Sequence, residues 1–210
     1  VLATEESNTW ISSGDALTAL LWGVNTRARQ TANIHRVHCS QQPDTEMIAM
    51  AADGRERSPD KCMTGGQYFG NFNVLFMTTV PSADLLSMDT VAGARVALAI
   101  RKSIDRQLST DAIADRIRFM EAPEYAGRIR WGGDLVLTNW CRFDLFLDFG
   151  WGRPFDATGG EGALPPAYVR LQQQHDNGDV TVVITIEREG GHAMKSDALL
   201  NKYATLLKIR

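Results

Sequence analysis

The sequence predicts a mixed α/β domain, because helical and strand patterns alternate along its 210 residues. Residues 12–29 carry apolar side chains at the three- and four-residue spacing of an amphipathic helix. Residues 68–80 are rich in β-forming residues and alternate like a strand. Two further strand-like segments, 167–174 and 179–187, flank an Asn-Gly dipeptide typical of a hairpin turn. Several strands mixed with helices indicate an α/β architecture.

The first predicted helix has both a cap and an apolar stripe. Ser12 and Asp15, three residues apart, fit the capping-box pattern. The stripe consists of Leu17, Leu20, Leu21 and Val24. Helical spacing returns over 89–122, where a second helix is expected to start at Thr110 and Pro123 sets the limit.

The remaining elements are shorter. Apolar runs predict strands at 47–52, 134–140 and 143–149. The strand over 68–80 is expected to stop at Pro81, since proline cannot donate to a sheet ladder. The tail over 192–208 has helical spacing, with His192 at a helix start.

Composition argues against several classes of function. The net charge is −3 and the pI about 5.8, so no general attraction to nucleic acid or to an anionic membrane is expected. No apolar run approaches the roughly 20 residues that span a bilayer. The three cysteines, Cys39, Cys62 and Cys141, are widely spaced and form no C-x-x-C pair, which favours a reduced cytoplasmic protein. His35 and His38 lack further ligands at metal-binding spacing, so no metal site is expected.

One five-residue run is far more distinctive than the rest. The sequence Asp148-Phe149-Gly150-Trp151-Gly152 matches the D-F-G-W-G signature of the BAHD acyltransferases, which transfer acyl groups from coenzyme A. Other segments resemble family landmarks in the same order: the helix at 10–22, Asp53-Gly54-Arg55, Tyr68-Phe69-Gly70-Asn71, and Thr138-Asn139-Trp140 ahead of the signature. The chain therefore resembles the C-terminal half of a BAHD enzyme.

The resemblance implies a fold and a domain organisation. The fold should be that of chloramphenicol acetyltransferase-like enzymes, a mixed sheet with covering helices in two layers. Residues 1–210 would form one C-terminal domain, without the N-terminal domain that carries the H-x-x-x-D motif. The chain begins at Val1 rather than Met, which suggests a removed upstream segment, although ordinary processing gives the same start.

The resemblance also implies the chemistry. Family members move an acyl group from acyl-CoA, a co-substrate rather than a permanently bound cofactor, to a hydroxyl or amine of a small molecule. The general base is the His of H-x-x-x-D, so we expect no catalytic residue in this chain and no activity of this chain alone. The string His175-Asp176-Asn177-Gly178-Asp179 has the right letters, but it lies after D-F-G-W-G in a predicted turn. We therefore expect it not to be catalytic.

Site residues are carried over from the matching landmarks. Thr138, Asn139 and Trp140 are expected to line the acyl and acceptor pocket, the alternative being ordinary strand residues with Trp140 in the core. The residues expected beside the coenzyme A arm are Ser12, Ser13, Asp53 and Gly54, where a helix N-terminus favours anionic groups. The residues expected to be structural are Arg55, Asp148, Gly150, Trp151 and Gly152, with Arg55 paired to Asp148.

Two further readings remain open at the level of sequence. A non-catalytic ligand- or partner-binding domain could keep the fold and lose the reaction. A partner half could also turn the cleft to another reaction on a bound metabolite. The segment Trp140-Cys141-Arg142-Phe143 departs from the commoner plant pattern, which suggests a fungal enzyme of specialised metabolism.

Overall fold

The structure, a computed structural model, describes residues 10–34, 44–59, 68–121, 132–155, 164–173 and 178–207. Its strands are β1 Thr45–Asp53, β2 Asn73–Pro81, β3 Leu135–Asn139, β4 Tyr168–Gln173 and β5 Val180–Thr185. Its helices are α1 Ser13–Thr31, η1 Arg55–Arg57, α2 Ser82–Leu86, α3 Thr90–Gln107, α4 Thr110–Glu121, α5 Arg188–Met194 and α6 Ala198–Tyr203.

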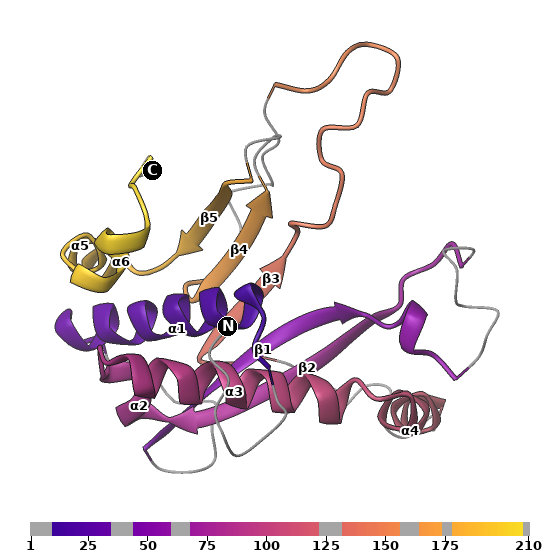
Figure 1. The fold of residues 1–210 in the computed structure, drawn as a ribbon, viewed down its shortest axis with the longest axis horizontal. Helices are drawn as coiled ribbons and strands as arrows, with labels where there is room; N and C mark the ends of the chain where they lie inside the picture. The colour runs from indigo at the N-terminus through magenta and orange to yellow at the C-terminus, as the bar shows by residue number, and fades with distance from the viewer. Residues whose placement is uncertain are drawn as a thin grey trace.

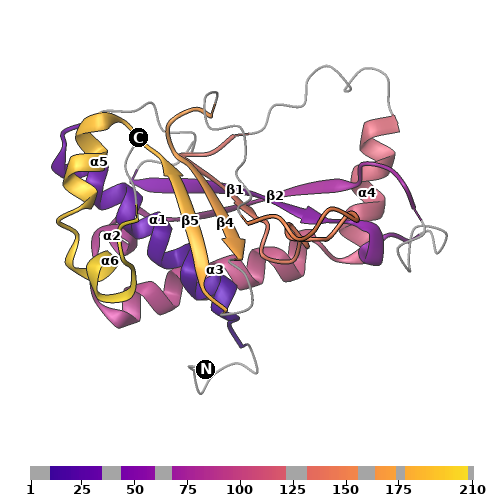
Figure 2. The same ribbon diagram turned by 90° about the horizontal axis from the view of Figure 1, so that it is seen from above.

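The strands form one mixed five-stranded sheet in the order β2-β1-β3-β4-β5. The neighbours β1 and β3, and β3 and β4, run parallel, whereas β2 and β5 pair antiparallel at the two edges. The antiparallel β4–β5 pair confirms the strand pairing of the predicted hairpin, while residues 174–177 of its turn lie outside the described residues. Helices α1 and α3 lie side by side on one side of the sheet (Figures 1 and 2). The mixed α/β fold with covering helices is thus confirmed.

Alternate strand positions build the core between the sheet and these helices. Strands β1, β2, β3 and β4 each contribute two buried apolar side chains to this core. They are Ile48, Met50, Val74, Phe76, Leu135, Leu137, Val169 and Leu171. They pack with Trp22 of α1 and Ile100 of α3, both fully buried. Because side chains alternate along a strand, the residues between them point to the opposite face of the sheet.

The start of α1 confirms the predicted capping box. The Ser12 hydroxyl accepts a hydrogen bond from the Asp15 amide at 3.1 Å, and the Asp15 carboxylate accepts one from the Ser12 amide at 2.7 Å. Arg101 of α3 donates to the Asp15 carboxylate at 2.6 Å and to the Ser12 hydroxyl at 3.1 Å. The cap therefore also fixes α1 against α3.

The outer edge of β2 is covered by side chains rather than by another strand. Gln107, the last residue of α3, accepts from the Met77 amide at 3.1 Å and donates to the Met77 carbonyl at 2.5 Å. Arg116 of α4 donates to the Leu75 carbonyl. These contacts satisfy backbone groups that an edge strand would otherwise leave open.

Two local predictions are wrong. Residues 143–149 form turns rather than a strand, within a segment that extends away from the sheet up to residue 155 (Figure 1). An apolar run alone predicted that strand, but in the described structure no neighbouring strand pairs with it. His192 lies in the last turn of α5, which begins after Glu187. His35, His38, Cys39, Cys62 and His175 lie outside the described residues.

Candidate functional site

The carboxyl ends of the parallel strands β1, β3 and β4 meet at one edge of the sheet, the usual place for ligands in α/β folds. Asp53 ends β1, and Thr138 and Asn139 end β3. Arg170 lies in the middle of β4, beside Thr138. Polar side chains therefore collect where the strand topology favours a binding site.

Thr138, Trp140 and Arg170 form a contiguous cluster at this edge. Thr138 and Arg170 are register partners in the parallel β3–β4 pair, so their side chains share the face opposite α1 and α3. The Trp140 Nε1–H donates to the Thr138 hydroxyl at 3.1 Å. The guanidinium carbon of Arg170 lies 4.8 Å from the centroid of a Trp140 ring. The predicted Thr138 and Trp140 are thus in direct contact.

The predicted Asn139 does not join this cluster. It points to the other face of the strand, is exposed, and accepts a hydrogen bond from the Cys141 amide at 2.9 Å. Trp140 is half-buried and reaches the surface rather than lying in the core. The pocket assignment of all three residues remains a prediction.

Arg170 is a buried cation that the sequence analysis missed. It is 3% exposed, and its Nε atom is buried without a hydrogen-bond partner. Taking a guanidinium out of water costs several kcal/mol, and a desolvated cation–π contact returns only about 2 kcal/mol. In the part of the chain that the structure describes, no carboxylate forms an ion pair with it. In the sequence, burial of Arg170 was indicated only by its position between two apolar residues, Val169 and Leu171.

The residues expected beside coenzyme A have definite local roles. The Ser12 hydroxyl caps α1 and contacts Arg101. Asp53 accepts hydrogen bonds from the Arg55 amide at 3.0 Å and from its guanidinium at 2.9 Å. A Cβ on Gly54 would lie 2.6 Å from the Val74 side chain, so glycine permits a close approach there. A ligand role for Ser12, Ser13, Asp53 and Gly54 stays a prediction.

The D-F-G-W-G segment differs from the expected arrangement. Asp148 is exposed, and its carboxylate accepts hydrogen bonds from the amides of Gly150 at 2.7 Å and Gly152 at 3.0 Å. Both glycines have positive φ angles, 99° and 93°, which suit glycine.

Arg55, the expected partner of Asp148, instead contacts Asp53 and the carbonyls of Tyr68 and Gly70. The expected Arg55–Asp148 pair is therefore absent from the described contacts, because this segment extends away from the sheet.

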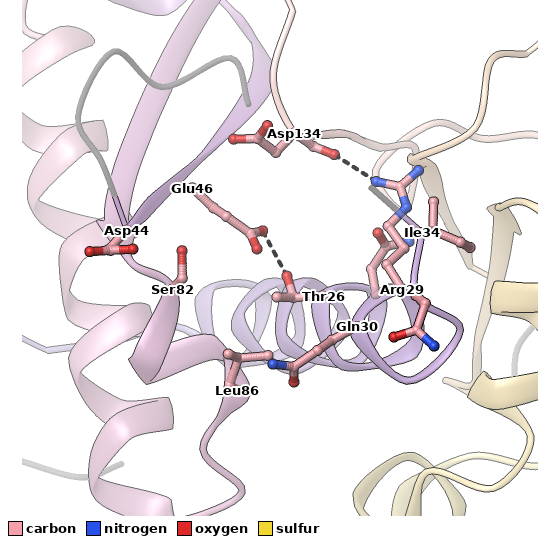
Figure 3. Close-up of a pocket in the computed structure, with 11 residues that line it drawn as sticks. Thr26, Arg29, Gln30, Ile34, Asp44, Glu46, Ser82, Leu86 and Asp134 are labelled. Carbon is pink, nitrogen blue, oxygen red and sulfur yellow. Dashed lines mark hydrogen bonds between the residues drawn. The ribbon is translucent and has the colours of Figure 1, made fainter. Parts of the chain in front are cut away.

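A separate cavity of about 410 Å³, to which mostly polar residues contribute, lies at the opposite end of the sheet, near the start of β1 and β3. Figure 3 shows Thr26 and Arg29 of α1 facing Glu46 and Asp134 across it. Glu46 accepts hydrogen bonds from Thr26 at 2.7 Å and from the buried Trp22 indole at 3.2 Å. Arg29 forms a bidentate pair with Glu187 and also donates to the Asp134 carbonyl. These contacts hold helix, sheet and C-terminal segment together.

The described residues offer no other reactive centre. Among them, no three His, Cys, Asp or Glu side chains are grouped to hold a metal ion. Burial raises the pKa of the Cys141 thiol, which keeps it protonated and a poor nucleophile. None of the described helices is both long and apolar enough to cross a membrane.

Comparison with known proteins decides the family. The sequence model of the Transferase family matches residues 1–200. The chain belongs to the BAHD acyltransferase family. A BAHD relative from Avena sativa, a hydroxycinnamoyl-CoA:5-hydroxyanthranilate N-hydroxycinnamoyltransferase, is 33% identical over 66% of this chain and 31% of its own length. Hydroxycinnamoyltransferase 1 of Oryza sativa subsp. japonica is 30% identical over 71% of this chain and 34% of its own length.

Solved structures agree on the BAHD fold. TRI101 of F. sporotrichioides, in complex with coenzyme A and T-2, superposes with a TM-score of 0.71 at 19% identity, covering 96% of this chain and 45% of that one. Vinorine synthase gives a TM-score of 0.58 at 16% identity, with 89% and 41% covered. The chain thus spans less than half the length of these relatives.

Proposed function

We propose that this chain is the C-terminal half of an enzyme that moves an acyl group from acyl-CoA to a hydroxyl or amine of a small specialised metabolite. The general-base His would belong to an N-terminal half, on the same polypeptide or a second one. The observation that carries the proposal is family membership across residues 1–200, combined with the Thr138–Trp140 pair at the ligand-binding edge of the sheet.

The chemistry divides between the two halves. The His of the N-terminal half takes the proton from the acceptor as its oxygen or nitrogen attacks the thioester carbonyl. Negative charge collects on the carbonyl oxygen, and the thiol of coenzyme A then leaves with the proton. Thr138 suits the charged oxygen because its own oxygen already accepts from the Trp140 indole. Its hydroxyl proton is thereby left to donate.

The coenzyme A arm would run past the start of α1 and the loop after β1. Ser12 and Ser13 lie at the helix N-terminus, where backbone amides favour phosphate. Arg101 adds a positive charge beside Ser12, although Asp15 neutralises it. Because Gly54 has no side chain, the loop after β1 packs directly against Val74 of β2.

The N-terminal half would pack on the segment that extends from the sheet. Phe149 is 74% exposed, and Trp151 and Phe155 are each 94% exposed. Exposed aromatic side chains in one contiguous segment are typical of a protein interface. The proposal is supported by the length of the relatives, since this chain covers only 31% of the Avena sativa protein and 45% of the F. sporotrichioides TRI101 chain.

The decisive test is an acyl-transfer assay on the complete protein with acyl-CoA and a panel of small alcohols and amines. Thr138→Val should lower kcat by about 10²-fold, the cost of one oxyanion donor. Thr138→Ser keeps the hydroxyl and should retain most of the activity. Equal activity of the Val variant and the wild type would rule out this role for Thr138.

A non-catalytic binding domain is the second candidate. Its support is the same extended aromatic segment, which could hold a partner without any reaction. The complete protein would then bind acyl-CoA or a partner but release no free coenzyme A with any acceptor. We also propose a cytoplasmic, fungal enzyme, supported by the free thiol of Cys141 and by the unusual sequence after Trp140.

A further inference from the structure

We propose that Arg170 binds a carboxylate carried by the acyl acceptor, so that the enzyme prefers acidic acceptors over neutral ones. This inference rests on the proposed acyl transfer at the same edge of the sheet. The carboxylate would accept hydrogen bonds from the guanidinium while the reacting hydroxyl or amine lies near Thr138.

The first argument is the missing counter-charge. Arg29 and Arg170 are the two arginines that are buried among the described residues, and Arg29 has a carboxylate partner, Glu187. The half-buried Arg27 and Arg101 also pair with carboxylates, Asp197 and Asp15. Arg170 is the most buried of these at 3% exposure, yet within the described ranges its one recorded contact is with the Trp140 ring. An aromatic face compensates a buried cation in part, and an anionic oxygen compensates it more fully.

The second argument is location. Arg170 and Thr138 are register partners on adjacent parallel strands, which places their backbones about 4.8 Å apart on the same face. Thr138 and Trp140 are half-buried and open this face to the surface. In the proposed complex, a small acceptor places one end at the Thr138 hydroxyl and an acidic group at the guanidinium. The Trp140 indole would form the wall between them.

The competing source of the counter-charge is a carboxylate side chain of the N-terminal half. That arrangement would make Arg170 part of the interface between the halves. Its loss would weaken assembly and lower activity towards every acceptor equally. A bound acid would instead make the loss depend on the charge of the acceptor.

The experiment uses the complete enzyme and pairs of acceptors that differ only in charge. An aminobenzoate and the corresponding aminobenzamide serve as acceptors, with one acyl-CoA held constant. In the wild type, kcat/KM should favour the acid. Arg170→Gln should lower kcat/KM for the acid by about 10- to 100-fold, mainly through KM, and leave the amide unchanged. Arg118→Gln, a surface arginine, should change neither.

A binding measurement on the wild type tests the proposal without relying on catalytic turnover or on correct folding of the Arg170→Gln variant. Calorimetry on the wild type should detect benzoate and show benzamide binding at least tenfold more weakly. Equal binding of the two probes, or an equal loss with both acceptors in Arg170→Gln, would overturn the proposal. Absence of acyl transfer with any acceptor, while benzoate still binds selectively, would refute the acyltransferase function and leave the anion site intact.

Discussion

At the scale of single residues, Gly54 shows how closely the segments are packed at the edge where the parallel strands end. Its amide donates to the Phe72 carbonyl at 2.9 Å. An added Cβ would lie 2.6 Å from the Val74 side chain and 3.2 Å from the Phe72 ring. The loop that follows β1 is thus held against the start of β2 with no room for a side chain.

We expect Gly54→Ala to destabilise the protein by about 1–3 kcal/mol, the usual cost of overpacking. Gly93→Ala is the matched control, because its Cβ would meet no atom within 4 Å and it lies inside α3. That variant should be stabilised by up to about 1 kcal/mol. Urea unfolding of both variants measures the difference, and a neutral Gly54→Ala would contradict the close packing.

At the scale of elements, a buried ion pair fixes the C-terminal helix. Arg27 of α1 contacts Asp197, the N-cap of α6, at 2.8 Å and also donates to the Leu85 carbonyl of α2. Burial alone would raise the pKa of Asp197, but the hydrogen bonds from Arg27 and the Leu200 amide lower it below its ordinary value of 3.8. The charged form of Asp197 is therefore the one that stabilises the fold.

A lowered pKa in the folded state means that stability is present above pH 3.8 and is lost as the pH falls through the folded pKa. Asp197→Asn should thus cost about 2 kcal/mol at pH 7, and the difference from the wild type should shrink below about pH 4. Asp115→Asn, at an exposed pair with Arg118, should have little effect. Thermal melts across this pH range measure both, and a pH-independent gap would contradict the linkage.

Features that depend on neighbouring residues could be predicted from the sequence, whereas features that depend on pairing between elements could not. Helix α1 and its cap follow from local spacing and from Ser12 and Asp15, so local chemistry was enough. Thr138 and Trp140 were identified by their motif, and their contact spans only two residues. Arg170 was missed because its burial depends on pairing with β3, which no local pattern shows. The strand expected over 143–149 was wrong for a related reason: an apolar run does not supply a neighbouring strand.

At the scale of the whole molecule, the extended segment presents exposed aromatic side chains to solvent. Its aromatic side chains have little packing within the described structure, as Trp151 at 94% exposure illustrates. Burying a Trp at an interface frequently contributes at least 2 kcal/mol. The proposed N-terminal half would therefore gain much of its affinity from this segment.

Trp151→Ala should weaken association of the two halves, expressed as separate chains, by about 10- to 100-fold in Kd. Met120→Ala removes an exposed apolar side chain from α4, away from this segment, and serves as the control. Calorimetric titration of one half with the other measures both. Unchanged affinity in Trp151→Ala would show that the partner binds elsewhere.

The contact between Gln107 and Met77 has a consequence for the behaviour of many copies in solution. An uncovered edge strand is a template on which a second molecule can add its own strand, and repetition of that step produces fibrils. The Gln107 amide binds the same amide and carbonyl that an incoming strand would need. Together with Arg116, which binds the Leu75 carbonyl, this side chain blocks strand addition at the β2 edge and opposes polymerisation there.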